Sequence, residues 1–340
     1  MSLLRFRYRA FLSEEQVNEL VRPSPDTVEL VCAWLAHNGI PSSSISRTHG
    51  GTWLTVSDLR VTQASELLGA SYQLYRNIKT NETIIRTGGY SLPEALHTRI
   101  QTVAPTTCFP SMEVVLHTPH KRAFGTARAQ AQAASGKLVT RLQPPPLPPP
   151  PPILGPAILR WLYRTIVYQP VAYGPGQNSL AVVGSQSPSW GDLTDFVDTY
   201  RAGGADASFT FVPLTDNMGD PGLTSNVAVQ YATAMAYPTP LFFLGTTVTD
   251  TSLVDLLLFL MSLASIPQTI SISYNYFFEP VFPEESAEYI CFLFARLAVR
   301  GVSVLVASGN RGVGNEHCVD REGNVKFVPE FPSSCTYGVS

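Results

Sequence analysis

The chain has 340 residues, of which 44% are hydrophobic and 14% are charged, so its composition indicates a globular protein long enough for two cores. A net charge of −3 without a basic stripe gives no electrostatic argument for a nucleic-acid partner. No apolar run reaches the roughly 18 residues that a membrane-spanning helix needs. The run Leu253–Ala264 has the length of a buried helix instead.

Residues 1–110 predict a small α+β unit. Its first strong element is a helix over Ser24–Gly39, because Ser24 can cap the start, Pro25 suits the first turn and Gly39 can close the end. The later elements that we expect are a strand Thr52–Val56, a helix Val61–Leu68, and a strand pair Tyr72–Arg76 and Thr83–Thr87. Asn81 lies between the paired strands and begins an Asn-Glu-Thr triplet, which makes it a glycosylation candidate.

Residues 111–155 differ in composition and contain a proline run at Pro144–Pro152, interrupted by Leu147. Such a run forms a stiff, extended spacer. It could also bind a proline-reading domain such as SH3 or profilin. We favour the linker interpretation and keep the docking site as an alternative.

From residue 156 onward, strand-like and helical patterns alternate, which predicts an α/β fold with a doubly wound parallel sheet. The expected strands are Leu180–Val183, Thr210–Pro213, Leu241–Gly245, Thr269–Tyr274 and Val302–Ala307. The expected helices are Trp190–Tyr200, Ser225–Ala236, Ser252–Ala264 and Glu284–Arg300. The last strand runs into Ser308–Gly314, a loop with three glycines that permit positive φ and close backbone approach. Ligands of open α/β sheets bind at such strand ends.

This loop resembles Ser-Gly-Asp-Ser-Gly-Val-Gly of the sedolisin, or serine-carboxyl peptidase, family. The resemblance extends along the chain through Pro23–Leu35, Ile85–Pro93, Gly155–Tyr163, Ala236–Pro240 and Phe331–Cys335. It implies a homologue of the fungal tripeptidyl-peptidase type, with a partial, ferredoxin-like activation propeptide over 1–110 and a linker over 111–155. Residues 156–340 would be the front part of a subtilisin-like peptidase domain, with an incomplete sheet.

The family activates a serine with a glutamate base that an aspartate orients, both carried four residues apart on one helix. Matched through Gln230-Tyr231, the base position falls on Thr224 and the orienting position on Ala228. Residues 221–249 contain no Asp or Glu, so no shift of register restores a carboxylate. A structural interpretation also fits: Thr224 or Ser225 caps the helix and Ala228 packs inward.

Two further family positions also differ here. The oxyanion-hole aspartate falls on Asn310, whose amide can still donate a hydrogen bond or simply occupy a turn. Ser273 and Tyr274 match the edge that pairs with substrate backbone, but Asn275 follows where the family has Gly. Peptide binding by strand addition is weakened, and an ordinary buried strand end is an equal alternative.

The resemblance carries several other expectations. The family's Gly-Thr-Ser-Ala-Ser nucleophile segment and its calcium loop would lie beyond Ser340, so we expect neither a nucleophile nor a metal, and no cofactor. Cys318 and Cys335 match cysteines seen together in many fungal members, which implies a disulfide in an oxidising compartment. The family is secreted, whereas the N-terminus does not read as a signal peptide, so the chain would be cytoplasmic if complete.

The sequence thus leaves three hypotheses open. The favoured one is a truncated peptidase homologue without catalysis, whose family partner is a peptide or protein substrate. The first alternative is a fragment of an active secreted acid tripeptidyl peptidase. The second is a non-catalytic interaction protein that uses the proline run Pro144–Pro152.

Overall fold

The structure is a computed structural model of the whole chain. It describes residues 10–48, 50–76, 78, 81, 83–109, 155–170, 178–201, 204, 206–216, 218–247, 251–273, 277–278, 282–309, 324, 327 and 329–338. Residues 1–112 and 170–340 cluster into one compact unit, and residues 113–169 into a second. The domain boundaries at residues 110 and 155 were predicted from changes in the sequence pattern. These two boundaries stay a prediction. No helix within the described ranges is long and apolar enough to cross a membrane.

The described residues between 10 and 109 form an α+β arrangement of short elements. These are α1 (Glu14–Leu20), α2 (Pro25–His37), a 3₁₀ turn (Ser42–Ser44), β1 (Ile45–Arg47), β2 (Leu54–Val56), α3 (Val61–Leu67), β3 (Gln73–Arg76), β4 (Thr83–Arg86) and a second 3₁₀ turn (Glu94–Leu96). The strands pair antiparallel as β1–β2 and β3–β4. Ser24 caps α2 as predicted, because its hydroxyl accepts from the Thr27 N–H. Val31, Leu35, Ile40 and Leu96 form the buried core of this part.

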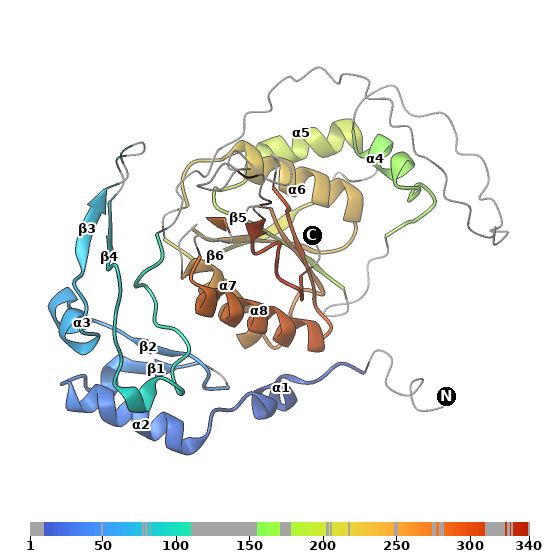
Figure 1. Cartoon of the computed structure of the whole chain (residues 1–340). Helices are drawn as coiled ribbons and strands as arrows, with labels where there is room; N and C mark the ends of the chain where they lie inside the picture. Colours follow the sequence, from blue (N-terminus) through green and yellow to red (C-terminus); the bar gives the residue numbers. More distant parts are fainter. Residues whose placement is uncertain are drawn as a thin grey trace. The chain divides into compact units, whose positions relative to one another are not determined.

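A five-stranded parallel sheet organises the second half of the chain (Figure 1). Its strands are β5 (Leu180–Gly184), β6 (Phe209–Pro213), β7 (Leu241–Gly245), β8 (Thr269–Ile272) and β10 (Ser303–Val306). The order across the sheet is β10-β8-β5-β7-β6, with every pairing parallel. β5, the first of these five strands along the chain, therefore lies at the centre of the sheet. The predicted doubly wound α/β fold is confirmed.

Helices cover both faces of this sheet (Figure 1). The covering helices are α5 (Trp190–Tyr200), α6 (Leu223–Ala236), α7 (Ser252–Ser262) and α8 (Glu284–Val299). Successive strand residues point to opposite faces. Val182 joins the core cluster under α5 and α6, whereas its neighbours Ala181 and Val183 join the cluster under α7 and α8. All three side chains are at most 1% exposed, as expected for a strand buried on both faces.

The helix α7 lies deepest of the covering helices. Leu256, Leu257 and Leu260 have no measurable exposure, and the predicted buried helix over this apolar run is confirmed. It packs beside α8, whose Leu293, Phe294 and Leu297 are likewise fully buried. An apolar helix of this kind is stable only when neighbouring elements bury it on several sides.

Several short elements were not predicted from the sequence. They are α1 and β1 in the first part, α4 (Pro156–Leu162), and the antiparallel pair β9 (Phe277–Phe278) and β11 (Glu330–Phe331). Each spans seven residues or fewer, too short for hydrophobic periodicity to reveal it.

Leu257→Ala is expected to destabilise the protein by about 2–5 kcal/mol, because it leaves a cavity in the core cluster under α7 and α8. Leu20→Ala is the matched control, since Leu20 is 75% exposed, and should change stability by about 0.5 kcal/mol or less. Urea unfolding followed by circular dichroism measures both. Equal midpoints for the two variants would contradict this assignment of the core.

Candidate functional site at the carboxyl ends of the strands

The N-terminus of α6 lies at the carboxyl end of the central strand β5. The Gly222 N–H donates to the Ser187 carbonyl at 3.1 Å, and the side chain of Gln186 lies against Gly222. A Cβ on Gly184 would come within 2.8 Å of the Ser225 hydroxyl, so helix and strand touch at this point. The neighbouring strand is fixed there too, because the Thr246 N–H donates to the Gly184 carbonyl at 3.0 Å.

This edge of the sheet carries the two positions that the sequence matches to the family's carboxylates. Thr224 is exposed in the first turn of α6, and Ala228 is half-buried four residues later, packed against the core cluster under α5 and α6. The predicted inward packing of Ala228 is confirmed. The predicted cap is wrong: the N-cap is Gly222, and no side chain caps α6. Neither a hydroxyl nor a methyl group can serve as a carboxylate base.

Asn226, between these two positions, ties α6 to α5. Its amide donates to the Asp192 carboxylate at 2.6 Å and accepts from the Ser189 N–H at 2.6 Å. Ser189 in turn caps α5 through the Asp192 N–H, and Gln230 donates to the Asp192 carbonyl. The role of Asn226 was not predicted, because no local sequence pattern indicates a hydrogen bond to a residue 34 positions away.

The glycine-rich loop after β10 begins at the same edge. Gly309 has a φ of +90°, and a Cβ there would lie 2.5 Å from the Glu330 carboxylate oxygen Oε1. The predicted need for glycine is therefore confirmed at this position, both by the backbone conformation and by the approach of Glu330. Asn310 lies outside the described residues. Glu330 was not singled out from the sequence, because it lies 21 positions further along the chain.

Other predicted site residues are only partly described. Ser273 is half-buried immediately after β8, while Tyr274 and Asn275 lie outside the described residues, as does the proline run Pro144–Pro152. Asn81 is exposed with a φ of +63°, in the turn between β3 and β4. A turn of this kind suits asparagine and leaves its side chain accessible.

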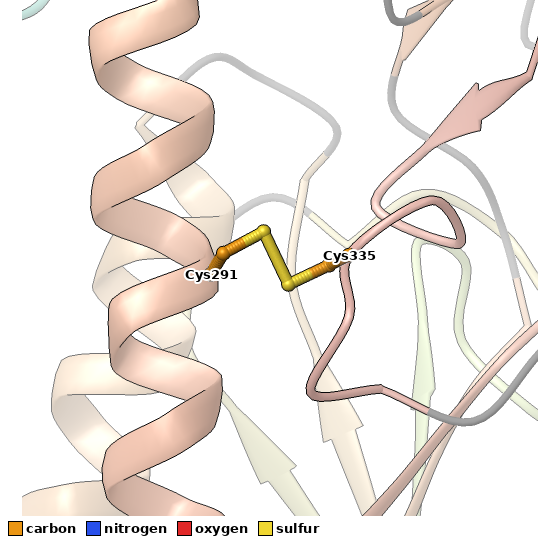
Figure 2. Close-up of a disulfide and its surroundings, with 2 residues drawn as sticks. All are labelled: Cys291 and Cys335. Carbon is orange, nitrogen blue, oxygen red and sulfur yellow. A yellow bond between two sulfur atoms is a disulfide. The ribbon is translucent and has the colours of Figure 1, made fainter.

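The structure contains a disulfide between Cys291 on α8 and Cys335 in the segment after β11 (Figure 2). Their Cα atoms are 5.6 Å apart, within the range that a disulfide spans. The expected partner of Cys335 was Cys318, which lies outside the described residues. The expectation is corrected here: it was drawn from a resemblance in sequence, whereas the fold brings α8 against the β11 segment.

The described part of the chain offers no group of three or more His, Cys, Asp or Glu residues that could hold a metal ion. Its strand ends instead present hydroxyl, amide and backbone groups around the start of α6. Such groups can donate and accept hydrogen bonds from a peptide. They supply no acid–base pair at Thr224 and Ala228.

Known proteins are similar to this chain in sequence. Residues 5–109 match the family described as the Pro-kumamolisin activation domain. The probable tripeptidyl-peptidase SED3 of Arthroderma benhamiae is 27% identical over 98% of this chain and 57% of its own length. The tripeptidyl-peptidase SED3 of Arthroderma otae is 26% identical over the same shares. The chain thus spans little more than half the length of these relatives.

One solved structure is also similar, a Pseudomonas sedolisin complexed with two molecules of pseudo-iodotyrostatin. It matches with a TM-score of 0.38 and 14% identity over 51% of this chain and 49% of the other.

Residues 5–109 are thus similar to an activation domain, and they precede a parallel α/β sheet. Nearly the whole chain is similar in sequence to proteins named tripeptidyl-peptidases.

Gly309→Ala is expected to lower stability by about 1–2 kcal/mol, because alanine is strained at positive φ and its Cβ would meet the Glu330 carboxylate. Gly191→Ala is the control: Gly191 is helical in α5, and the nearest atom to an added Cβ is 3.9 Å away. That substitution should stabilise by up to about 1 kcal/mol. Chemical unfolding of both variants measures the difference, and a stabilised Gly309→Ala protein would contradict the geometry.

Loss of the Cys291–Cys335 disulfide is expected to cost about 2–4 kcal/mol, since the bond closes a loop of 44 residues in the unfolded chain. The Cys291→Ser variant should unfold at lower urea concentration than the parent, and added reductant should remove the difference. Cys32→Ser, at a half-buried free cysteine, is the control and should respond to reductant as the parent does. Peptide mapping that joins Cys335 to another cysteine would overturn the pairing.

Proposed function

We propose that the chain is a sedolisin-like peptidase homologue that does not itself hydrolyse peptides. The observation that carries this proposal is the surface of α6: Thr224 and Ala228 occupy the positions at which the family places its glutamate and aspartate. Catalysis by a carboxylate base requires a group that takes up a proton from the nucleophile and is held in orientation. Threonine and alanine supply neither function.

The environment of α6 supports the same proposal. Ala228 packs against a core cluster of apolar side chains, where a carboxylate would lose hydration. Thr224 faces solvent. The helix nevertheless keeps its contacts with α5, because the side chains of Asn226 and Gln230 donate hydrogen bonds to Asp192. The helix thus keeps its structural role without its acid–base role.

The ligand class is part of this proposal. The relatives are named as tripeptidyl-peptidases, which favours peptides or proteins as what the strand ends bind. An oxidising compartment, and with it secretion, is supported by the Cys291–Cys335 disulfide.

The test is hydrolysis of a fluorogenic tripeptide amide and of a denatured protein substrate between about pH 3 and about pH 7, the range in which a carboxylate base titrates. No product above the buffer rate is expected, from the parent or from Thr224→Val. The control variant is Thr210→Val, which removes an exposed hydroxyl from the edge strand β6. Turnover that disappears in Thr224→Val and persists in Thr210→Val would overturn the proposal.

A further inference from the structure

A buried arginine connects the activation domain to α8. Arg296 is only 3% exposed, and its guanidinium donates through Nη1 to the Thr52 hydroxyl at 3.1 Å and through Nη2 to the Asn18 side-chain oxygen at 2.8 Å. Its Nε has no hydrogen-bond partner. Both acceptors are neutral and both belong to residues 10–109, which share one compact unit with α8. The hydrogen bonds of the Arg296 guanidinium to Thr52 and Asn18 are therefore accepted by groups of the activation domain.

Aromatic packing surrounds this arginine. Trp53 stacks on Tyr289 with ring centroids 5.1 Å apart and planes 23° from parallel, and the Tyr289 hydroxyl lies 3.4 Å from that of Thr52. The guanidinium carbon of Arg296 lies 5.9 Å from the centre of the Phe292 ring. Trp53 packs against the main core cluster, and Cys108 is a buried member of it. The core is continuous across the two parts.

The rim of the contact is polar and mostly uncharged. The Leu12 N–H donates to the Val299 carbonyl at 2.9 Å, and the hydroxyls of Thr102 and Ser286 lie 2.8 Å apart. Two carboxylates take part: Glu288 accepts from Gln101 at 3.3 Å, and Glu14 lies 3.7 Å from Arg300. The Gln101–Glu288 contact is exposed, whereas the Glu14–Arg300 pair is partly buried, with side chains 21% and 10% exposed.

We propose that the activation domain of this chain is a permanent subunit of the α/β part: residues 10–109 stay bound to α8 after the connecting segment is cut, and stay bound in acid. The partner that binds the outer face of α8 is thus the chain's own N-terminal part, residues 10–109. The proposal does not depend on whether the protein hydrolyses peptides.

The charges around Arg296 support resistance to acid. The titratable groups that face it are Tyr289 and Arg300 from α8 and Glu14 from α1. Burial lowers the pKa of Arg296, and a depressed arginine pKa still leaves the guanidinium protonated from acid to neutral pH. Burial raises the pKa of Tyr289, so its contribution is lost only when alkaline pH rises through that raised pKa. The hydrogen bonds that the buried guanidinium donates go to neutral groups, whereas the carboxylates of Glu14 and Glu288 contact Arg300 and Gln101 instead.

The experiment places a recognition sequence for a site-specific protease between residues 127 and 135 of the full chain. The cut protein is then run by size-exclusion chromatography at about pH 7 and about pH 4, in about 0.1 M and about 1 M salt. Both fragments should elute together under all four conditions. Release at pH 4 alone would overturn the acid resistance, and release under every condition would overturn the whole proposal.

Matched variants test which contacts hold the fragments together. Thr52→Val removes an acceptor from buried Arg296 and should raise the dissociation rate of the cut protein about tenfold or more. Thr55→Val makes the same change at an exposed position of β2 and should leave the rate unchanged. Glu14→Gln should leave elution unchanged at both pH values. Equal rates for Thr52→Val and Thr55→Val would contradict the role assigned to the Arg296 contact.

A second pair of variants separates lost contact from lost folding. Trp53→Ala removes the stacking on Tyr289 and should speed dissociation, while Trp53→Phe keeps a ring and should restore retention in large part. Circular dichroism of the uncut variants shows whether the activation domain still folds. A folded Trp53→Ala protein whose fragments dissociate at the parental rate would count against the proposal.

Discussion

Burial of the parallel sheet on both faces is the constraint on which the rest of the structure depends. Strands β5 and β7 are apolar on each side, so two layers of helices must cover them. The strand order β10-β8-β5-β7-β6 follows, with α5 and α6 over one face and α7 and α8 over the other. It also brings the start of α6, with Thr224 in its first turn, to the end of β5. The position of the candidate site thus follows from the packing of helices that buries the core.

The chemistry at that location can change without disturbing the scaffold. Gly184 and Gly222 set the close approach of α6 to β5, and Asn226 links α6 to α5. None of these contacts needs a carboxylate at position 224 or 228. Alanine at 228 fills a place against apolar side chains, where burying an unpaired charge is costly. The packing of α6 is thus complete without a carboxylate at either position, although Ala228 itself lies against the core.

Long elements could be predicted from the sequence, and contacts between distant segments could not. The five sheet strands and four covering helices carry clear periodicity, and their observed bounds fall within a few residues of those expected. Short elements such as α1 and β11 carry none. The pairing of Cys335 with Cys291, the approach of Glu330 to Gly309 and the contact of Thr52 with Arg296 each join residues far apart in sequence. These three contacts become visible only in the folded chain, because no local sequence pattern indicates which surfaces pack against each other.

Arg296 shows how strongly the two parts of the chain depend on each other. A buried guanidinium without a carboxylate has lost hydration that only well-placed acceptors can offset. Thr52 and Asn18 provide those acceptors, and both come from the activation domain. Removing that domain would take away the Trp53 ring that stacks on Tyr289 and leave Arg296 without either acceptor. An ion pair at this place would weaken as its carboxylate took up a proton, whereas neutral acceptors keep their strength through the same range of pH. The neutral acceptors Thr52 and Asn18 therefore give a contact whose hydrogen bonds do not depend on the protonation of a carboxylate.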